Sequence, residues 1–65
     1  MDGSKVKLAR VEKELTQQAL AELVGVTRQT INLIEKGKYN PTIKLCVELA
    51  KSLGKTLDEL FWEED

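Results

Sequence analysis

The chain has no histidine and only one cysteine, Cys46. One cysteine cannot form an intrachain disulfide, and without histidine the chain has no Cys/His zinc site. The same shortage argues against an enzyme, because no nucleophile and base can be assembled from one thiol and scattered carboxylates. No basic residue adjoins Cys46 to lower its pKa, so we expect a buried, inert thiol rather than a redox sensor.

Long apolar runs are also missing. No stretch approaches the roughly 20 residues of a membrane-spanning helix, and no signal-peptide pattern opens the chain. We therefore expect a cytoplasmic protein with no membrane partner, and nothing indicates a cofactor, a metal or a small-molecule ligand. No repeat, low-complexity segment or strand-like alternation is present. A chain of 65 residues predicts one small domain, 1–65, for which dimerisation is a common source of additional stability.

The net charge is only −1, but it is unevenly distributed. Residues 1–44 hold eight Lys and Arg against five acids, a net charge of +3, and residues 45–65 hold two lysines against six acids, a net charge of −4. The basic half can therefore face a phosphate backbone, because the local field matters more than the total charge. The acidic end at 63–65 is most simply a solvated tail.

The segment 17–36 predicts two short helices joined by a tight turn. Leu20, Leu23 and Val24 have the spacing of one helix face, which Thr16 can cap and Gly25 can end.

Thr27 can cap the second helix, whose apolar positions are Ile31 and Ile34. Ala21 supplies the small side chain that two closely crossing helices need. This arrangement is the helix-turn-helix signature.

The second helix would then be a recognition helix whose early residues point at the DNA major groove. Arg can bond guanine in a bidentate way, and Gln or Asn can do the same to adenine. A polar, solvated face of an amphipathic helix is the plainer interpretation, but the tight turn and the small crossing residue favour DNA binding. The candidate side chains are Thr27, Arg28, Gln29, Thr30 and Asn32.

Three further helices complete an all-α, five-helix domain. Ser4 can cap a first helix through about Glu14, with Val6 or Leu8, Val11 and Leu15 on its inner side. Thr42 can cap a fourth helix that Gly54 ends, with Ile43, Cys46, Leu49, Ala50 and Leu53 at helical spacing. Thr56 and Glu59 form a capping box for a short fifth helix, whose core-facing residues would be Leu57, Leu60 and Phe61. We expect the first three helices to pack around Leu8, Val11, Leu20, Val24, Val26, Ile31 and Ile34.

In combination, these motifs resemble the Cro/cI-like helix-turn-helix family of bacterial and phage regulators, also called the xenobiotic response element or lambda-repressor-like family. The resemblance covers about residues 5–61. The matching stretches are Leu15-Thr16-Gln17, Leu20-Ala21, Gly25-Val26, Arg28-Gln29-Thr30-Ile31, Ile34-Glu35, Gly37-Lys38-Tyr39-Asn40-Pro41 and Leu57-Asp58-Glu59-Leu60-Phe61. It implies a sequence-specific repressor that binds a palindromic operator in double-stranded DNA as a homodimer. An antitoxin-type autoregulator and a protein-interaction module are the alternatives.

The resemblance also implies roles for individual residues. It places base contacts at Thr27, Arg28, Gln29 and Asn32, and backbone contacts at Gln17, Thr30, Lys36, Lys38, Tyr39 and Asn40. Tyr39 could equally be a loop-packing residue. Arg10 and Glu35 match a structural salt bridge, although Arg10 could also lie near a phosphate. The C-terminal helix and tail, 56–65, would form the dimer contact through Phe61 and Trp62, with full or partial burial in the monomer as the alternative for Trp62.

Three positions depart from the family pattern. Glu14 stands where relatives often have glycine, so the first helix would end less sharply. Lys55 replaces a commonly apolar residue and would weaken packing between the fourth and fifth helices. Leu33 occupies a position that some relatives fill with a polar base reader; it could touch a thymine methyl group, and we slightly favour inward packing.

Overall fold

Residues 2–62, which the computed structural model describes, fold into five helices and no strands. The acidic end at 63–65 lies outside the described residues, so the expectation for it stays a prediction. The helices are α1 (Ser4–Glu12), α2 (Gln17–Val24), α3 (Arg28–Glu35), α4 (Ile43–Leu53) and α5 (Leu57–Phe61). The all-α, five-helix prediction is therefore confirmed. No helix among the described residues has the length and apolar character needed to cross a membrane.

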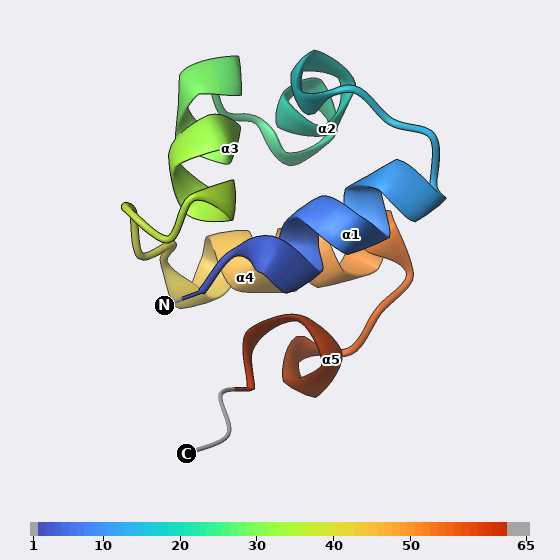
Figure 1. Cartoon of the computed structure of the whole chain (residues 1–65), viewed down its shortest axis with the longest axis vertical. Coiled ribbons are helices and arrows are strands. Elements are labelled where there is room, and N and C mark those ends of the chain that lie inside the picture. The colour runs from blue at the N-terminus through green and yellow to red at the C-terminus, as the bar shows by residue number, and fades with distance from the viewer. Residues whose placement is uncertain (1, 63–65) are drawn as a thin grey trace.

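The helices are stacked so that the two of the helix-turn-helix lie at one end of the molecule. In Figure 1, α2 and α3 stand together at the top, α1 and α4 cross the middle, and α5 lies below them. Helix α2 packs against α3 and α4, whereas α1 packs against α3, α4 and α5. Helix α3 is thus supported from behind by α1 and α2.

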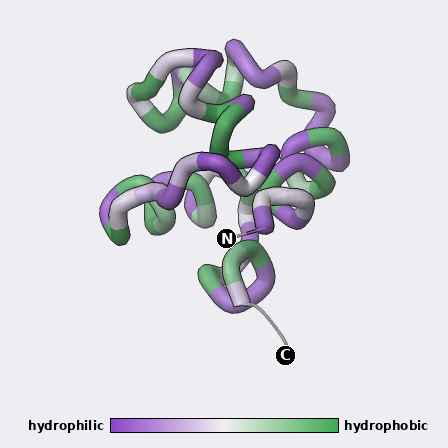
Figure 2. Tube along the Cα trace, turned by 60° about the vertical axis from the view of Figure 1, so that its left-hand side comes forward, coloured by the Kyte–Doolittle hydropathy of each residue, from purple (hydrophilic) through white to green (hydrophobic). Residues whose placement is uncertain are grey.

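A single hydrophobic core joins all five helices. The largest fully buried side chains of this core come from all five helices, and each helix supplies at least one. They are Val6, Leu20, Ile31, Leu49, Leu53 and Leu60. Leu15, Val24, Val26 and Phe61 are partly buried and pack against it. Figure 2 shows apolar residues alternating with polar ones along the helices, as expected where each helix buries one face only. Cys46 is buried, as predicted, and burial raises the pKa of its thiol.

Threonine side chains cap four of the five helices. The hydroxyl oxygens of Thr16, Thr27, Thr42 and Thr56 accept hydrogen bonds from the main-chain N–H three residues later. Thr56 and Glu59 form the predicted capping box. These four helix starts could be predicted because a cap depends on neighbouring residues alone.

The start of α1 differs from the prediction. Gly3, not Ser4, is the N-cap, and it makes no side-chain cap bond. Ser4 is the first helical residue, and its N–H donates to the Asp2 carboxylate at 2.9 Å. Gly3 is buried, and a Cβ at this position would lie 1.8 Å from the Ile34 carbonyl oxygen. The N-terminal segment is thus part of the fold because its backbone passes directly over the end of α3.

The inner face of α1 also differs. Leu8 and Val11 are 62% and 53% exposed, whereas Val6 and Ala9 are buried. The expected core roles of Leu8 and Val11 are therefore wrong. The Arg10 side chain is 12% exposed and turns inward beside Ala9 to reach Glu35, so the buried stripe of α1 contains a charged residue. Because Arg10 interrupts the apolar spacing, a search for apolar periodicity does not detect this stripe.

Two other apolar residues expected in the core lie at helix starts and are exposed. Ile43 is the first residue of α4 and Leu57 the first of α5, and both are exposed. Leu23, which shares a predicted face with Leu20, is exposed as well. Periodicity gives the angle of a residue around its helix, but it does not show how far along the axis a neighbouring helix extends to cover it.

Candidate nucleic-acid interface

The turn between α2 and α3 is three residues long and rigidly hydrogen-bonded. Gly25 takes the left-handed conformation, with a φ of 77°. The Val26 N–H then donates to the Ala21 carbonyl at 3.0 Å, and the Thr27 hydroxyl caps α3 through the Thr30 N–H at 3.2 Å. Ala21 is fully buried. The angle between the two helices is thereby fixed by local bonds.

Helix α3 presents one polar face to solvent. At about 100° per residue, Gln29, Leu33 and Lys36 fall on the side opposite the buried Ile31, and Asn32 lies at the edge of this face. Gln29 and Lys36 are exposed, and Asn32 is half-buried. Leu33 is 40% exposed, so the inward packing favoured for it is wrong, and it lies among the polar residues of this face.

The loop after α3 is held by a glycine-based helix stop. Gly37 has a φ of 72°, and its N–H donates to the Ile34 carbonyl at 3.0 Å. The Lys38 N–H donates to the Leu33 carbonyl at 2.9 Å, which completes a Schellman motif. Lys38, Tyr39 and Asn40 follow it and are exposed. They extend the polar surface beyond the end of the recognition helix.

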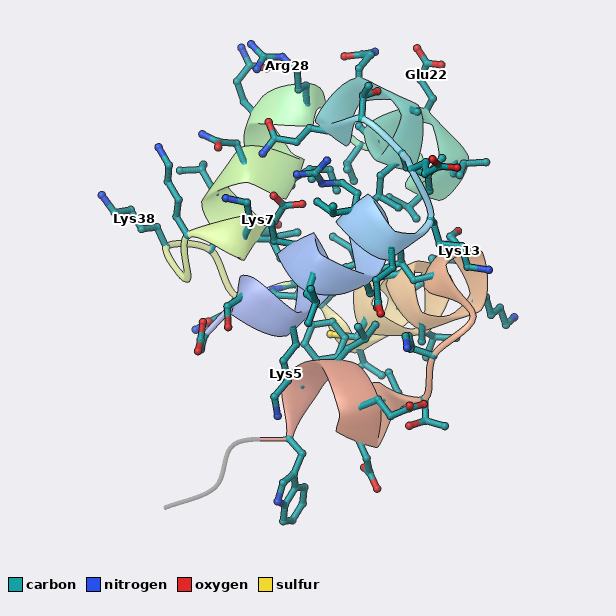
Figure 3. The ribbon with its side chains drawn as sticks, turned by 45° about the vertical axis from the view of Figure 1, so that its right-hand side comes forward. Lys5, Lys7, Lys13, Glu22, Arg28 and Lys38 are labelled. Carbon is teal, nitrogen blue, oxygen red and sulfur yellow. The ribbon has the colours of Figure 1, made fainter. Side chains whose placement is uncertain are left out.

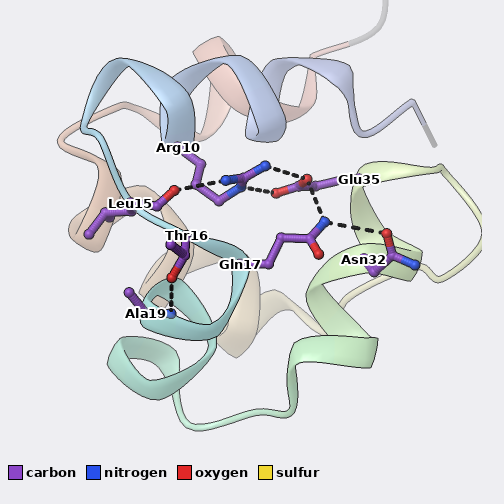
Figure 4. A network of polar contacts seen from close by, with 7 residues as sticks. All are labelled: Arg10, Leu15, Thr16, Gln17, Ala19, Asn32 and Glu35. Carbon is purple, nitrogen blue, oxygen red and sulfur yellow. Dashed lines mark hydrogen bonds and ion pairs between the residues drawn. The ribbon is translucent and has the colours of Figure 1, made fainter.

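A polar network joins α1, α2 and α3 beneath this face (Figure 4). Arg10 Nε lies 2.7 Å from Glu35 Oε2, and Arg10 Nη2 lies 3.2 Å from Glu35 Oε1. Arg10 Nη1 donates to the Leu15 carbonyl at 2.7 Å. The side chains of Arg10 and Glu35 are 12% and 3% exposed. The salt bridge that the resemblance implies is thus present, nearly buried, and also fixes the loop between α1 and α2.

Gln17 extends this network to the recognition helix. Its Nε2 atom donates to Glu35 Oε1 at 3.1 Å and to Asn32 Oδ1 at 3.3 Å. Both amide protons are therefore engaged inside the protein. The main-chain N–H groups of Gln17 and Gln18, at the start of α2, have no hydrogen-bond partner among residues 2–62.

The basic side chains around α3 project from one side of the molecule. Figure 3 shows Arg28 and Lys38 reaching outward near the two ends of this helix, whereas Lys13 lies on the far side of the fold. Arg28, Lys36 and Lys38 are exposed and form no ion pair within the described part of the chain. Their charges are available to an external anion.

The C-terminal residues expected at a dimer contact differ in burial. Phe61 is half-buried against the core, and Trp62 is 63% exposed. The Trp62 carbonyl accepts a hydrogen bond from Lys5 Nζ at 2.9 Å, which ties the end of α5 to α1. Full burial of Trp62 within the monomer, one form of the alternative for this residue, is therefore wrong. Lys55 forms a long ion pair with Glu12 at 3.7 Å, so it links α1 to the segment before α5.

Comparison with known proteins agrees with this geometry. The model of a helix-turn-helix family matches residues 6–60. The chain belongs to the Cro/cI-like helix-turn-helix family. Among its relatives, an HTH-type transcriptional regulator of Methanocaldococcus jannaschii is 47% identical over 62 residues, which cover 95% of this chain and 94% of the relative.

Two solved structures show the same Cro/cI-like fold. The P22 c2 repressor, crystallised with a synthetic operator, superposes with a TM-score of 0.90 at 26% identity, over 95% of this chain and 94% of that one. The restriction-modification controller protein C.AhdI of Aeromonas hydrophila superposes with a TM-score of 0.84 at 32% identity, over 91% and 89% of the two chains. This Cro/cI-like protein is a DNA-binding transcriptional regulator.

The structure gathers most of the candidate residues on one surface of this Cro/cI-like domain and separates others from it. Phe61 and Trp62 lie on α5 and its end, at the opposite end of the molecule from α2 and α3 (Figure 1). The link from Gln17 to Asn32 was missed from the sequence. Two amides 15 residues apart carry no local signal of contact, since the contact exists only once α2 and α3 have packed.

Proposed function

We propose that this protein is a sequence-specific repressor that binds a palindromic operator as a C2 homodimer. The observation that carries the proposal is the exposed row of hydrogen-bonding side chains on α3, presented by a rigid turn. Repression would follow from occupation of promoter DNA. The P22 c2 repressor supports the proposal, because a protein of the same fold forms a complex with an operator.

Base edges would be read from α3. Arg28 suits the two acceptors of guanine, and Gln29 suits the donor and acceptor of adenine. Thr27 and Asn32 would line the groove beside them. Leu33 is exposed among these polar residues, so we assign it to contact with a thymine methyl group.

The phosphate backbone would be held on both sides of the recognition helix. On one side, the free main-chain N–H of Gln17 lies at the N-terminus of α2, where the helix dipole favours an anion. The amide side chain of Gln17 is engaged within the protein. On the other side, the contacts would come from Lys36, Lys38, Tyr39 and Asn40, with Thr30 near the start of α3.

The dimer contact would be made by the end of α5, through Phe61 and Trp62. Trp62 is large, apolar and 63% exposed, and such residues are enriched at protein interfaces. A twofold axis near α5 would present two α3 helices about 34 Å apart, which is one turn of B-DNA. The operator would therefore contain two half-sites one helical turn apart.

Selection of bound duplexes from a random library tests the proposal. Wild type should enrich a palindrome. Gln29→Ala should lose preference at one base pair per half-site, at a cost of about 1–3 kcal/mol for the consensus. Lys38→Ala should weaken binding to all sequences alike and reduce the slope of log affinity against log salt by about 1.

The library should be selected at two salt concentrations, because non-specific binding is almost entirely electrostatic. Wild-type binding that enriches no sequence and disappears at moderate salt would overturn the proposal. An enriched consensus without twofold symmetry would overturn the homodimer alone.

A further inference from the structure

Leu33 is the one large apolar side chain that α3 exposes. It is 40% exposed, whereas Ile31 and Ile34, the other large apolar residues of this helix, are 0% and 2% exposed. At about 100° per residue, Leu33 and Gln29 both lie on the side opposite Ile31, one turn apart. Leu33 therefore belongs to the part of α3 that would enter a DNA groove most deeply.

The backbone around Leu33 is fixed. The Leu33 carbonyl accepts a hydrogen bond from the Lys38 N–H at 2.9 Å, within the Schellman motif that ends the helix. Ile31 and Ile34, on either side of Leu33 in the sequence, are anchored in the hydrophobic core. The Leu33 side chain thus cannot withdraw from the exposed face unless the whole helix moves.

The charges around Leu33 suit DNA better than a second protein surface. Lys36 follows by three residues, so the two Cβ atoms are about 5–6 Å apart. Arg28 and Lys38 reach outward near the two ends of the helix (Figure 3). These three cations form no ion pair among the described residues. The cores of protein interfaces are depleted of charged residues, whereas cations attract the phosphates of DNA, so the position of Leu33 favours contact with base edges.

A leucine side chain in the major groove has one favourable target. It neither donates nor accepts a hydrogen bond, so it would remove water from a base nitrogen or oxygen without replacing the lost bond. The apolar group that an unmodified base presents in this groove is the C5 methyl group of thymine. The modified base 5-methylcytosine carries the same methyl group on the same ring carbon. Leu33 has no polar side-chain atom with which to distinguish the cytosine amino group from the thymine carbonyl.

We propose that Leu33 reads the C5 methyl group itself, so that methylation of cytosine at the contacted position strengthens DNA binding. The ligand class then includes DNA methylated at cytosine C5 as well as DNA with thymine at that position. The assignment rests on the proposed function, because it needs α3 to lie in the major groove. It goes further, since it makes the affinity depend on a covalent modification of the DNA.

Four operator duplexes test the proposal. The contacted base pair is the one at which Leu33→Ala changes the consensus from the library selection. At this position, in one half-site, the duplexes carry thymine, uracil, 5-methylcytosine or cytosine. Uracil lacks only the methyl group of thymine, and cytosine lacks only that of 5-methylcytosine, so each pair isolates the methyl group. For wild type, the methyl group should strengthen binding about 3- to 5-fold in both pairs, as expected for burial of one such group.

Two variants separate the Leu33 contact from any effect of the methyl group on the DNA alone. With Leu33→Ala, the methylated and unmethylated duplexes of each pair should bind equally well. Leu8→Ala is the matched control, because Leu8 is 62% exposed on α1 and lines a groove with Lys55 and Leu60. It should keep the wild-type preference for the methyl group in both pairs.

Several results would overturn the inference and leave the repressor proposal intact. One is a consensus that Leu33→Ala leaves unchanged at every position, and another is a methyl preference that this variant retains. A preference for thymine over uracil without one for 5-methylcytosine over cytosine is a third. Weaker dimerisation of Leu33→Ala in sedimentation equilibrium, with no change in methyl preference, would assign Leu33 to a protein contact instead. If wild type enriches no sequence, the repressor proposal and the methyl contact fail together.

Discussion

At the scale of single residues, Glu14 is the position where sequence and backbone conflict. It is the one residue other than glycine with a positive φ in the described range, at 58°. The Leu15 N–H donates to the Arg10 carbonyl and the Glu14 N–H to the Val11 carbonyl, so α1 ends in the Schellman motif that glycine completes elsewhere in the chain. The expectation that α1 would end less sharply without glycine is wrong, because the hydrogen bonds impose the stop.

Glu14→Gly should stabilise the protein. The left-handed conformation costs an L-residue about 1–2 kcal/mol, and the added flexibility of glycine in the unfolded chain offsets part of that cost. We expect a net gain of about 0.5–1 kcal/mol in the free energy of unfolding, measured by urea denaturation. Glu14→Ala is the control: it removes the same carboxylate and keeps the strained φ, so a similar gain from alanine would contradict the backbone explanation.

Asn32 shows which properties of a residue the sequence predicts and which it does not. Asn32 was predicted as a base reader from its residue type and its place on the helix. The direction in which its amide points depends on Gln17 and Arg10, which are distant in sequence. The orientation of this side-chain amide is determined only when the three helices have packed together.

At the scale of helices, the short α5 depends on its capping box. The Thr56 hydroxyl accepts from the Glu59 N–H at 3.1 Å, and the Thr56 N–H donates to Glu59 Oε1 at 2.9 Å. This main-chain hydrogen bond, together with the Thr56 hydroxyl, lowers the pKa of Glu59 below its ordinary value of 4.5. The charged carboxylate is thus favoured in the folded state.

The stability that Glu59 contributes should disappear in acid. Because its folded-state pKa is lowered, the contribution is present above pH 4.5, its unfolded value, and is lost as the pH falls through the folded value. The free energy of unfolding, measured by circular dichroism between pH 7 and pH 3, should decrease less for Glu59→Gln than for wild type as the pH falls. The pKa of Asp2 is also lowered, but Asp2 is present in both proteins, so its contribution cancels in the comparison. An equal loss of stability in acid for Glu59→Gln and wild type would contradict the role of the Glu59 carboxylate in the capping box.

The salt bridge between α1 and α3 gives a second test at this scale. Arg10→Met leaves the Glu35 carboxylate nearly buried without its cation, and such losses cost about 3–5 kcal/mol. Glu35→Leu likewise leaves the nearly buried Arg10 guanidinium without its carboxylate partner. The double variant removes both charges and should be more stable than either single variant. A double-mutant cycle from urea denaturation measures this coupling, and additive single effects would show that the pair contributes no coupling energy.

The helices illustrate where local sequence is sufficient. Thr16, Thr27, Thr42 and Thr56 identify four helix starts because each cap bond spans three residues. The faces of α1 and the first residues of α4 and α5 could not be assigned in the same way. Burial there depends on where neighbouring helices begin and end, and on Arg10, a charged residue that belongs to the buried face.

At the scale of the whole molecule, the two proposed contact surfaces are separated along its length. The proposed DNA surface lies at the end formed by α2 and α3, and the proposed dimer contact lies at the end formed by α5 (Figure 1). Along the sequence, the net charge is +3 in residues 1–44 and −4 in residues 45–65. The exposed Arg28, Lys36 and Lys38 around α3 favour docking on DNA with α3 foremost, because phosphate attracts their charges.

This separation predicts that dimerisation can be removed without damage to the recognition surface. Trp62→Ala should weaken the dimer constant measured by sedimentation equilibrium and leave monomer stability almost unchanged, since the indole is 63% exposed. Leu23→Ala is the control, because Leu23 is 58% exposed on α2, which packs against α3 and α4. The Trp62 variant should still bind an isolated half-site like wild type, but lose its preference for two half-sites one turn apart. An unchanged dimer constant would place the twofold contact elsewhere on the molecule.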